Sequence, residues 1–497
     1  MTKKVLLWLD DSVSYLHFGI GLSLKKIHDY KFYGLTSFKK DYDFFSNQDL
    51  INFEELHYYP EHYESNTSFD IDFLKKIETK LDRNLWQMIY SERFFIEDRS
   101  FFHYYTKNEI FSIIEPIIKF YLDFLNRVQP DFIIMQQVGE NISNILLFYV
   151  AKSLGIKTLM LSPLKLFNSF LLSDDYKLNE IKSEYFKSLN STSSFSSVDI
   201  DYIKKRTHFS HVKTGMNAKF VKFSLSKKIT RYIQQFNKNP PLTYHNRHKN
   251  FSNYLPWLIK TKISQNKISK FLEKNSLREV IEKDNFVFFP LNQTPEAVNL
   301  FNSPYHSNLL SLIQYISKSL PVDSILYVKE HPAQKIKLWK SLTFYQDILK
   351  LPNVKLIHNE TSHFELISKC KAVIGVFPTA GFEALFFNKP VLTLHDIFYD
   401  GLNSVFPVND ISELPDLFTK AFQLKIDNSK ELSCLINVIE NNEIVIPYMN
   451  MMSDTLKIKS SLYNDSLNDS LDNFQNFYEH YQTEFDLIAN HYHNFKI

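Results

Sequence analysis

Short apolar runs alternate with amphipathic stretches along the first part of the chain. Residues 5–9 are apolar, follow two lysines and precede two aspartates, a pattern typical of a buried parallel strand. Residues 13–30 place apolar side chains at helical spacing, and residues 31–38 again have the composition of a strand. A strand, a polar loop, a helix and another strand are expected over residues 131–163. This alternation predicts a parallel sheet with crossover helices.

A second alternation begins at Asn285. Five apolar runs separated by four amphipathic stretches follow, and the runs read FVFFPL, ILYVKEHP, VKLIHN, AVIGVF and PVLTLH. They predict a second doubly wound domain. Residues 40–125 are rich in aromatics and mostly helical in pattern, whereas the periodicity weakens between 166 and 283.

The fold class expected from these patterns is α/β, with two Rossmann-like doubly wound domains that face each other across a cleft. The N-terminal domain would cover residues 1–165, and a basic, mostly helical connecting region residues 166–283. The C-terminal domain would cover residues 284–426, and residues 427–497 would form helices that pack across both domains. Ligands are expected at the carboxyl ends of the strands that line the cleft.

Composition adds constraints on location. No apolar run reaches the about 18 residues of a membrane-spanning helix. The N-terminus reaches its first aspartates too early for a signal peptide. Cys370 and Cys434, the only cysteines, form neither a metal-binding nor a disulfide pattern. A cytoplasmic protein without a bound metal is therefore expected.

The net charge of +2 conceals a strongly basic block. Residues 216–272 contain twelve Lys or Arg and no Asp or Glu, with aromatic residues between them. Such a block suits an anionic membrane surface, a phosphorylated substrate or nucleic acid, or it forms a solvated helical face. Because no nucleic-acid-binding module accompanies the charge, nucleic acid is not an expected partner. Basic and aromatic residues together favour peripheral contact with a membrane.

The loops after the predicted strands hold the candidate chemistry. No GxGxxG follows a strand and no GxxxxGK[ST] occurs, which argues against hydride transfer and nucleotide hydrolysis. The run ILYVKEHP instead ends in Lys329, Glu330 and His331, where the lysine and histidine could donate hydrogen bonds to a phosphate. The same triplet is also compatible with an ordinary surface loop.

The stretch GVFPTAGFEALFF follows another strand and begins a helix. Pro378 suits the first helical turn, and Thr379 can bond to exposed backbone N–H groups or to a ligand oxygen. Gly381 allows a ligand to approach the backbone at a helix N-terminus. Glu383 can accept bonds from a ribose or a base, or it merely offsets the helix dipole.

These blocks together resemble a known family. YVKEHP, NVKLIHNETSHFELISKCKAVIG, PTAGFEALFFNKPVLTL and FPLNQTPEAV are similar to the C-terminal domain of the capsule polysaccharide biosynthesis transferases, Kdo-transferase-like GT-B enzymes of bacterial surface-glycan assembly. They cover residues 285–400 in the expected order. The N-terminal domain resembles the family only in its layout.

The resemblance implies that the C-terminal domain binds a nucleotide-sugar donor and that the N-terminal domain binds the acceptor. His331 and Pro332 would be the HP pair beside the nucleotide phosphate. Where the family has glycine before the threonine, this chain has Pro378, which removes a backbone donor. The expected donor-binding residues are Lys329, Glu330, His331, Pro378, Thr379, Ala380, Gly381, Glu383, Pro295 and Glu296.

Catalytic carboxylates are expected from the N-terminal side of the cleft. Glu140, in the loop MQQVGENIS, is the first candidate for a general base, and Asp10 and Asp11 are the next for base or nucleophile. Alternatively, Glu140 and Asp11 cap the helices that follow them. His17 and His395 are assigned no role.

The hypothesis from the sequence is a metal-independent glycosyltransferase that needs no cofactor. It would move a sugar from a nucleotide donor, such as a CMP-linked acidic sugar, to a surface polysaccharide or lipid-linked glycan. One alternative is a CDP-polyol phosphotransferase of the teichoic-acid type, and another is a non-catalytic binding protein on the same fold.

Overall fold

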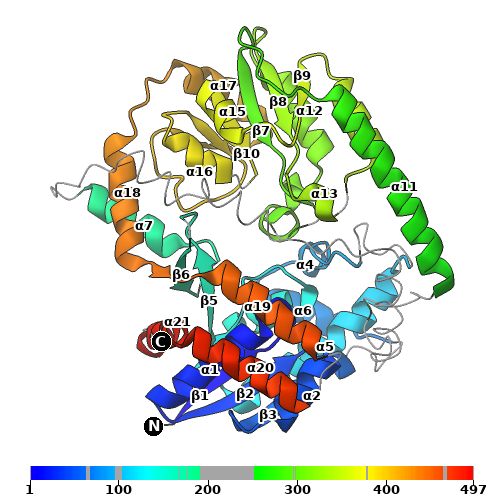
Figure 1. Cartoon of the computed structure of the whole chain (residues 1–497), viewed down its shortest axis with the longest axis vertical. Helices are drawn as coiled ribbons and strands as arrows, with labels where there is room; N and C mark the ends of the chain where they lie inside the picture. The colour runs from blue at the N-terminus through cyan, green and yellow to red at the C-terminus, as the bar shows by residue number, and fades with distance from the viewer. Residues whose placement is uncertain are drawn as a thin grey trace.

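The computed structural model has two sheets, one above the other in Figure 1. The residues that it describes are 2–62, 68–95, 103–166, 168–174, 176–190, 244, 251–294, 296, 298–337, 339–376, 379–462 and 467–495. Most of the basic block, together with Pro295 and Pro378, therefore lies outside the described residues.

The first sheet has seven strands in the order β13-β6-β5-β4-β1-β2-β3. The pairs β1–β2, β2–β3, β1–β4 and β4–β5 are parallel, whereas β6 pairs antiparallel with both β5 and β13. The strands are β1 Lys3–Trp8, β2 Tyr30–Thr36, β3 Phe53–Tyr58, β4 Phe132–Ile134, β5 Lys157–Pro163, β6 Ser169–Ser173 and β13 Ile444–Val445. The helices of this part are α1 Ser14–Ile27, α2 Lys39–Asn47, α3 Ile71–Leu81, α4 Leu85–Ile89, α5 Lys107–Val128 and α6 Ile142–Ser153.

The second sheet has six parallel strands in the order β12-β11-β10-β7-β8-β9. They are β7 Phe286–Pro290, β8 Ile325–Lys329, β9 Val354–Ile357, β10 Ala372–Gly375, β11 Val391–Thr393 and β12 Val405–Pro407. The helices around them are α12 Leu309–Ser319, α13 Gln334–Lys337, α14 Leu342–Leu349, α15 His363–Lys369, α16 Thr379–Leu385 and α17 Leu414–Gln423. The predicted α/β class with two Rossmann-like domains is confirmed, because separate apolar clusters surround each sheet.

Four segments link or cover the two domains (Figure 1). They are α7 Asn179–Leu189, α11 Phe251–Asn275, α18 Ser429–Asn442 and the C-terminal helices α19 Tyr448–Ser461, α20 Leu467–His480 and α21 Gln482–Asn494. Helices α7 and α18 contribute to a core of the second domain, whereas residues of α19, α20 and α21 join a core of the first. The boundaries expected at residues 165, 283 and 426 stay predictions.

A glycine lets the C-terminal helix α21 lie close against α1. A Cβ atom at Gly19 would lie 2.5 Å from the ring of Phe485, so any other residue here would require that ring to shift. Across the described part of the chain, no helix combines the length and apolar character needed to cross a membrane.

Candidate functional site

The strand order of each sheet identifies where a ligand can bind. In the second sheet, β7 and β10 are neighbours. The strand that follows β7 in sequence, β8, lies on one side of this pair, and the strand that follows β10, β11, lies on the other side. In the first sheet the same reversal occurs between β1 and β4. Crevices form at such points, outside the carboxyl ends of the strands. The loops after β1, β4 and β7 carry Asp10, Glu140 and Glu296, and Thr379 begins the helix α16 that follows β10.

The three residues of the predicted triplet, at the turn after β8, lie in different environments. Lys329 ends β8 and is buried, and burial lowers its pKa to about 8 although the nearby Glu383 acts to raise it. His331 is partly buried, and burial lowers its pKa. The backbone N–H of Ala333 donates to Nδ1 of His331 at 3.1 Å, so the neutral ring carries its proton on Nε2. His331 can therefore donate one hydrogen bond from Nε2.

Glu330 is held in the interior of the second domain. Its carboxylate accepts hydrogen bonds from Lys340 at 2.8 and 2.9 Å and from the Tyr345 hydroxyl at 2.6 Å. The backbone N–H of His331 also donates to it, at 2.8 Å. With 4% of its surface exposed, this carboxylate fixes the turn that presents His331. Its expected role in donor binding stays a prediction.

The loop after β7 is fastened to the same turn. The backbone N–H of Thr294 donates to the side-chain oxygen of Gln334 at 2.9 Å, and the Gln334 amide donates back to the Thr294 carbonyl at 2.9 Å. Glu296 lies close enough to His331 to oppose the lowering of the histidine pKa. Two sequence blocks that are 40 residues apart, FPLNQTPEA and KEHP, therefore meet at one position.

Helix α16 brings Gly381 and Glu383 into the interior, whereas Thr379 and Ala380 are half-buried. Glu383 lies 3.4 Å from Nε2 of His363 and 3% of its surface is exposed. The roles of these four residues in donor binding stay predictions, as do those of Pro295 and Pro378.

A lysine from the first domain faces Glu383. Lys165 follows β5 in a left-handed backbone conformation, with φ of 66°, and burial lowers its pKa to about 8 while Glu383 acts to raise it. Glu383 thus interacts with lysines from both domains, Lys165 and Lys329. The sequence interpretation missed Lys165, although its position directly after a predicted strand was a usable signal.

The predicted catalytic carboxylates are in different environments. Asp10 is buried and accepts hydrogen bonds from the Tyr59 hydroxyl at 2.6 Å and from Ser37. Glu140 is half-exposed and pairs with Arg93 at 3.1 Å. Asp11 begins a 3-10 turn, and its side chain is outside the described atoms. Their catalytic roles stay predictions.

The alternative capping role of Glu140 is wrong. Asn141, rather than Glu140, caps α6, because its side chain accepts from the Asn144 N–H. Val13 occupies the N-cap position of α1, and the capping role of Asp11 falls on a side chain outside the described atoms. Local sequence cannot predict which of two adjacent polar residues occupies the N-cap position, since that depends on where the loop ends.

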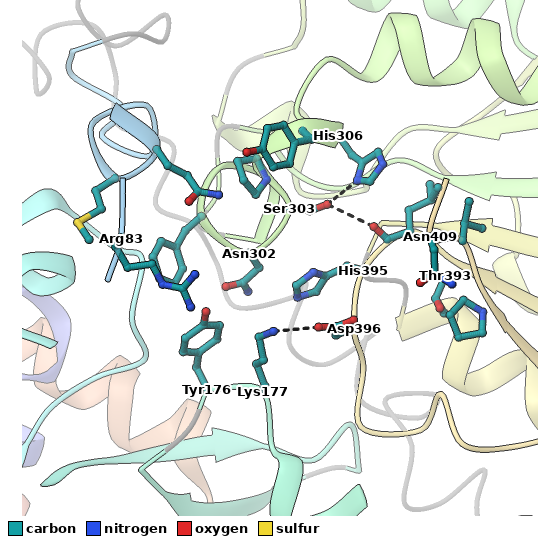
Figure 2. Close-up of a pocket in the computed structure, with 18 of the residues that line it drawn as sticks. Arg83, Tyr176, Lys177, Asn302, Ser303, His306, Thr393, His395, Asp396 and Asn409 are labelled. Carbon is teal, nitrogen blue, oxygen red and sulfur yellow. Dashed lines mark hydrogen bonds and ion pairs between the residues drawn. The ribbon is translucent and has the colours of Figure 1, made fainter. Parts of the chain in front are cut away.

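A cavity of about 340 Å³ lies between the two domains. Figure 2 shows side chains from both domains pointing into it. The first domain and its link to α7 contribute Arg83, Gln87, Met88, Tyr149, Tyr176 and Lys177. The second domain contributes residues 301–306, 393–396 and 407–409. The wall therefore includes residues 301–306, which follow the loop after β7, but none of the described donor-binding or catalytic candidates from the sequence.

The charged side chains that line the cavity, Arg83, Lys177 and Asp396, carry a net charge of +1. Lys177 pairs with Asp396 at 2.9 Å, and Arg83 lies over the ring of Tyr149 at 5.5 Å (Figure 2). Burial lowers the pKa of His395 to about 4 and also lowers that of His306, so both rings are neutral near pH 7. The site accordingly suits a ligand with a single negative charge.

Uncharged polar and aromatic groups complete the walls. Ser303 contacts Nδ1 of His306 at 2.9 Å, and the amides of Asn302 and Asn409 also line the cavity. The rings of Tyr176 and Phe301 lie 5.3 Å apart. Hydroxyl-binding amides beside aromatic faces are a chemistry that fits sugars. Sequence patterns did not identify this cavity, because its residues come from loops far apart in the chain.

The middle of the chain resembles a known protein family. Residues 189–403 match the model of the family described as "Capsule polysaccharide biosynthesis protein". The likeness to this family is therefore shown for this segment of the chain. The resemblance inferred from the sequence is therefore confirmed, and the matched capsule-synthesis segment includes the His331 turn, Glu383 and His395. No curated protein matches the chain.

Solved structures that match the chain have low sequence identity. The UDP-GlcNAc 2-epimerase from Methanocaldococcus jannaschii is 13% identical over 89% of this chain and 100% of its own, with a TM-score of 0.26. The beta Kdo 2,4 transferase of KpsC from Thermosulfurimonas dismutans is 13% identical over 62% of this chain and 87% of its own, with a TM-score of 0.29. The beta Kdo 2,7 transferase of the same KpsC is 13% identical over 75% and 97%, with a TM-score of 0.30. These likenesses assign no activity to this chain.

Proposed function

We propose that this protein is a glycosyltransferase that moves an acidic sugar from a nucleotide donor to a surface polysaccharide or lipid-linked glycan. The observation that carries the proposal is the cavity between two Rossmann-like domains, whose charged side chains carry one net positive charge. The match to the capsule polysaccharide biosynthesis family supports it. The reaction is proposed to occur in the cytoplasm, beside a membrane.

In this proposal the second domain holds the donor. The Nε2–H group of His331 donates to a phosphate oxygen, and Lys329 supplies positive charge behind it. Because the lowered pKa keeps the ring neutral, His331 acts as a hydrogen-bond donor and not as a cation near pH 7. Stabilising the leaving phosphate in this way needs no metal ion. Glu140, Asp10 and Asp11 remain the proposed candidates for the base that activates the acceptor.

Replacing His331 with alanine is expected to weaken nucleotide binding at least about tenfold, because a hydrogen bond to a charged phosphate is lost. Calorimetry of the full chain with CMP, CDP and UDP measures the change and ranks the nucleotides. His331→Gln should recover part of the affinity, since its amide can donate from a similar position. His480→Ala on the exposed surface of α20 is the control.

The same titrations separate the alternatives. Binding of none of the three nucleotides would reject the transferase, and unchanged binding by His331→Ala would reject the donor site. Nucleotide binding without transfer to any glycan acceptor would favour a non-catalytic protein. A preference for CDP-linked polyols over nucleotide sugars would favour the phosphotransferase.

The charge of the cavity predicts its sugar preference. Wild-type protein is expected to bind methyl glucuronide at least about tenfold more tightly than methyl glucoside, because only the former carries a carboxylate. Lys177→Gln and Arg83→Gln should each reduce that preference. Saturation-transfer NMR with the full chain measures both glycosides.

Lys182→Gln provides a matched control for Lys177→Gln. Lys182 pairs with Asp400 at 2.6 Å, and its side chain is 36% exposed, against 35% for Lys177. It does not belong to the cavity wall. Equal loss of preference in the two variants, or equal binding of the two glycosides by the wild type, would contradict the acidic-sugar assignment.

A further inference from the structure

Helix α11 has one face anchored to the second domain. Leu258, Ile268 and Leu272 are buried, and the last two belong to a core cluster of the second sheet. The side-chain oxygen of Gln265 accepts a hydrogen bond from the backbone N–H of Trp339 at 2.6 Å. These contacts fix which side of the helix faces solvent.

The opposite face of α11 combines lysines with exposed isoleucines. At the helical repeat of 3.6 residues per turn, its members fall within an arc of about 100°. They are Ile259, Lys260, Ile263, Lys267, Lys270 and Lys274. Ile259 and Ile263 are 47% and 52% exposed and lie one helical turn apart, so they form an exposed apolar pair among the lysines. We call this set the lysine–isoleucine face.

Negative charge is absent from most of this helix. Its sequence contains no Asp or Glu before Glu273, which lies outside the arc and is engaged by Arg278 and by His358 at 3.0 Å. Near the start of the helix, the rings of Tyr254 and Trp257 stack at 5.6 Å. Lysines, aliphatic side chains and aromatic rings on one helix are the composition of a helix that lies in a lipid headgroup layer.

We propose that the lysine–isoleucine face docks this protein on an anionic lipid bilayer. The lysines would contact lipid phosphates while the isoleucines enter the boundary between headgroups and acyl chains. Helix α11 runs along one side of the molecule beside both domains (Figure 1). Docking there would hold the interdomain cavity near a lipid-linked acceptor, a consequence that rests on the proposed function. The docking itself does not depend on catalysis.

Co-sedimentation of the full chain with vesicles tests the proposal. Vesicles of phosphatidylcholine with added phosphatidylglycerol should bind the protein, and vesicles of phosphatidylcholine alone should bind far less. The triple variant Lys260→Gln, Lys267→Gln, Lys270→Gln should bind the anionic vesicles about a hundredfold more weakly. The double variant Ile259→Ser, Ile263→Ser should lose the binding that remains at high salt, because apolar contact is not screened.

A second lysine triplet on α3 is the matched control. Lys75, Lys76 and Lys80 are exposed on that helix of the first domain, so changing all three to Gln removes the same charge. Equal loss of vesicle binding in the two triple variants would overturn the proposal, as would wild-type binding to duplex DNA that exceeds binding to the vesicles. Nucleotide calorimetry on the same samples shows whether each variant is folded and tests the transferase separately. Vesicle binding without nucleotide binding would reject the transferase and keep the docking face.

Discussion

Replacing Glu330 with alanine is expected to destabilise the protein by about 3–5 kcal/mol, the usual cost of removing one partner from a buried ion pair. The carboxylate accepts hydrogen bonds from Lys340, Tyr345 and the backbone of His331. Glu330 and Lys340 are 4% and 10% exposed, so water cannot replace the lost contacts. Urea unfolding followed by intrinsic fluorescence measures the loss.

Glu365→Ala is the matched control for burial. Glu365 also lies 2.8 Å from a lysine, Lys369, but the two side chains are 39% and 45% exposed. Removing this surface pair should cost less than about 1 kcal/mol. Similar losses in both variants would show that the Glu330 network is not a buried structural pair.

Glu330→Ala also tests whether Glu330 holds the His331 turn in place. Because Glu330 holds the backbone of His331, its removal should weaken nucleotide binding even where the variant remains folded. Glu330→Gln keeps the size of the side chain and can still accept from Tyr345, so it should retain more nucleotide affinity than Glu330→Ala. If Glu330 contributes only to stability, the folded fraction of both variants will bind nucleotide as tightly as the wild type.

The sequence predicted the order of the main elements because buried parallel strands are continuous apolar runs. Phe286–Pro290 and Ala372–Gly375 are examples, and both occupy the centre of the second sheet. Strands β12 and β13 have three and two residues, and neither belongs to the apolar runs recognised in the sequence. Strand β13 also pairs with β6, more than 270 residues earlier, and local patterns carry no information about such a partner.

The site was predicted less completely than the fold. Strand ends showed where polar residues gather, which located Lys329 and His331, but they did not show that Glu330 turns into the interior. Arg83 lies between α3 and α4, far from any strand end, and Lys177 lies in the link between β6 and α7. Only tertiary packing brings these two cations to the wall that carries His395.

Acid should destabilise the protein through His17. This ring is buried, and its Nδ1 lies 2.6 Å from the Trp8 carbonyl oxygen. Burial lowers its pKa from 6.5 to about 4, although the hydrogen bond to Trp8 acts in the opposite direction. Between these two values the unfolded chain binds a proton that the native state does not. Stability is therefore full above pH 6.5 and falls as the pH approaches 4.

The loss from this single group amounts to about 3 kcal/mol once the pH is below the folded pKa. His17→Asn retains an N–H donor for the Trp8 carbonyl and cannot titrate in this window. Urea unfolding across the window should show the stability advantage of the wild type over the variant shrinking as the pH falls. A wild-type-minus-variant difference that stays constant with pH would mean that His17 titrates alike in the folded and unfolded states. Subtracting the variant is essential, because burial also lowers the pKa of His395 to about 4, and that ring contributes to the acid sensitivity of both proteins equally.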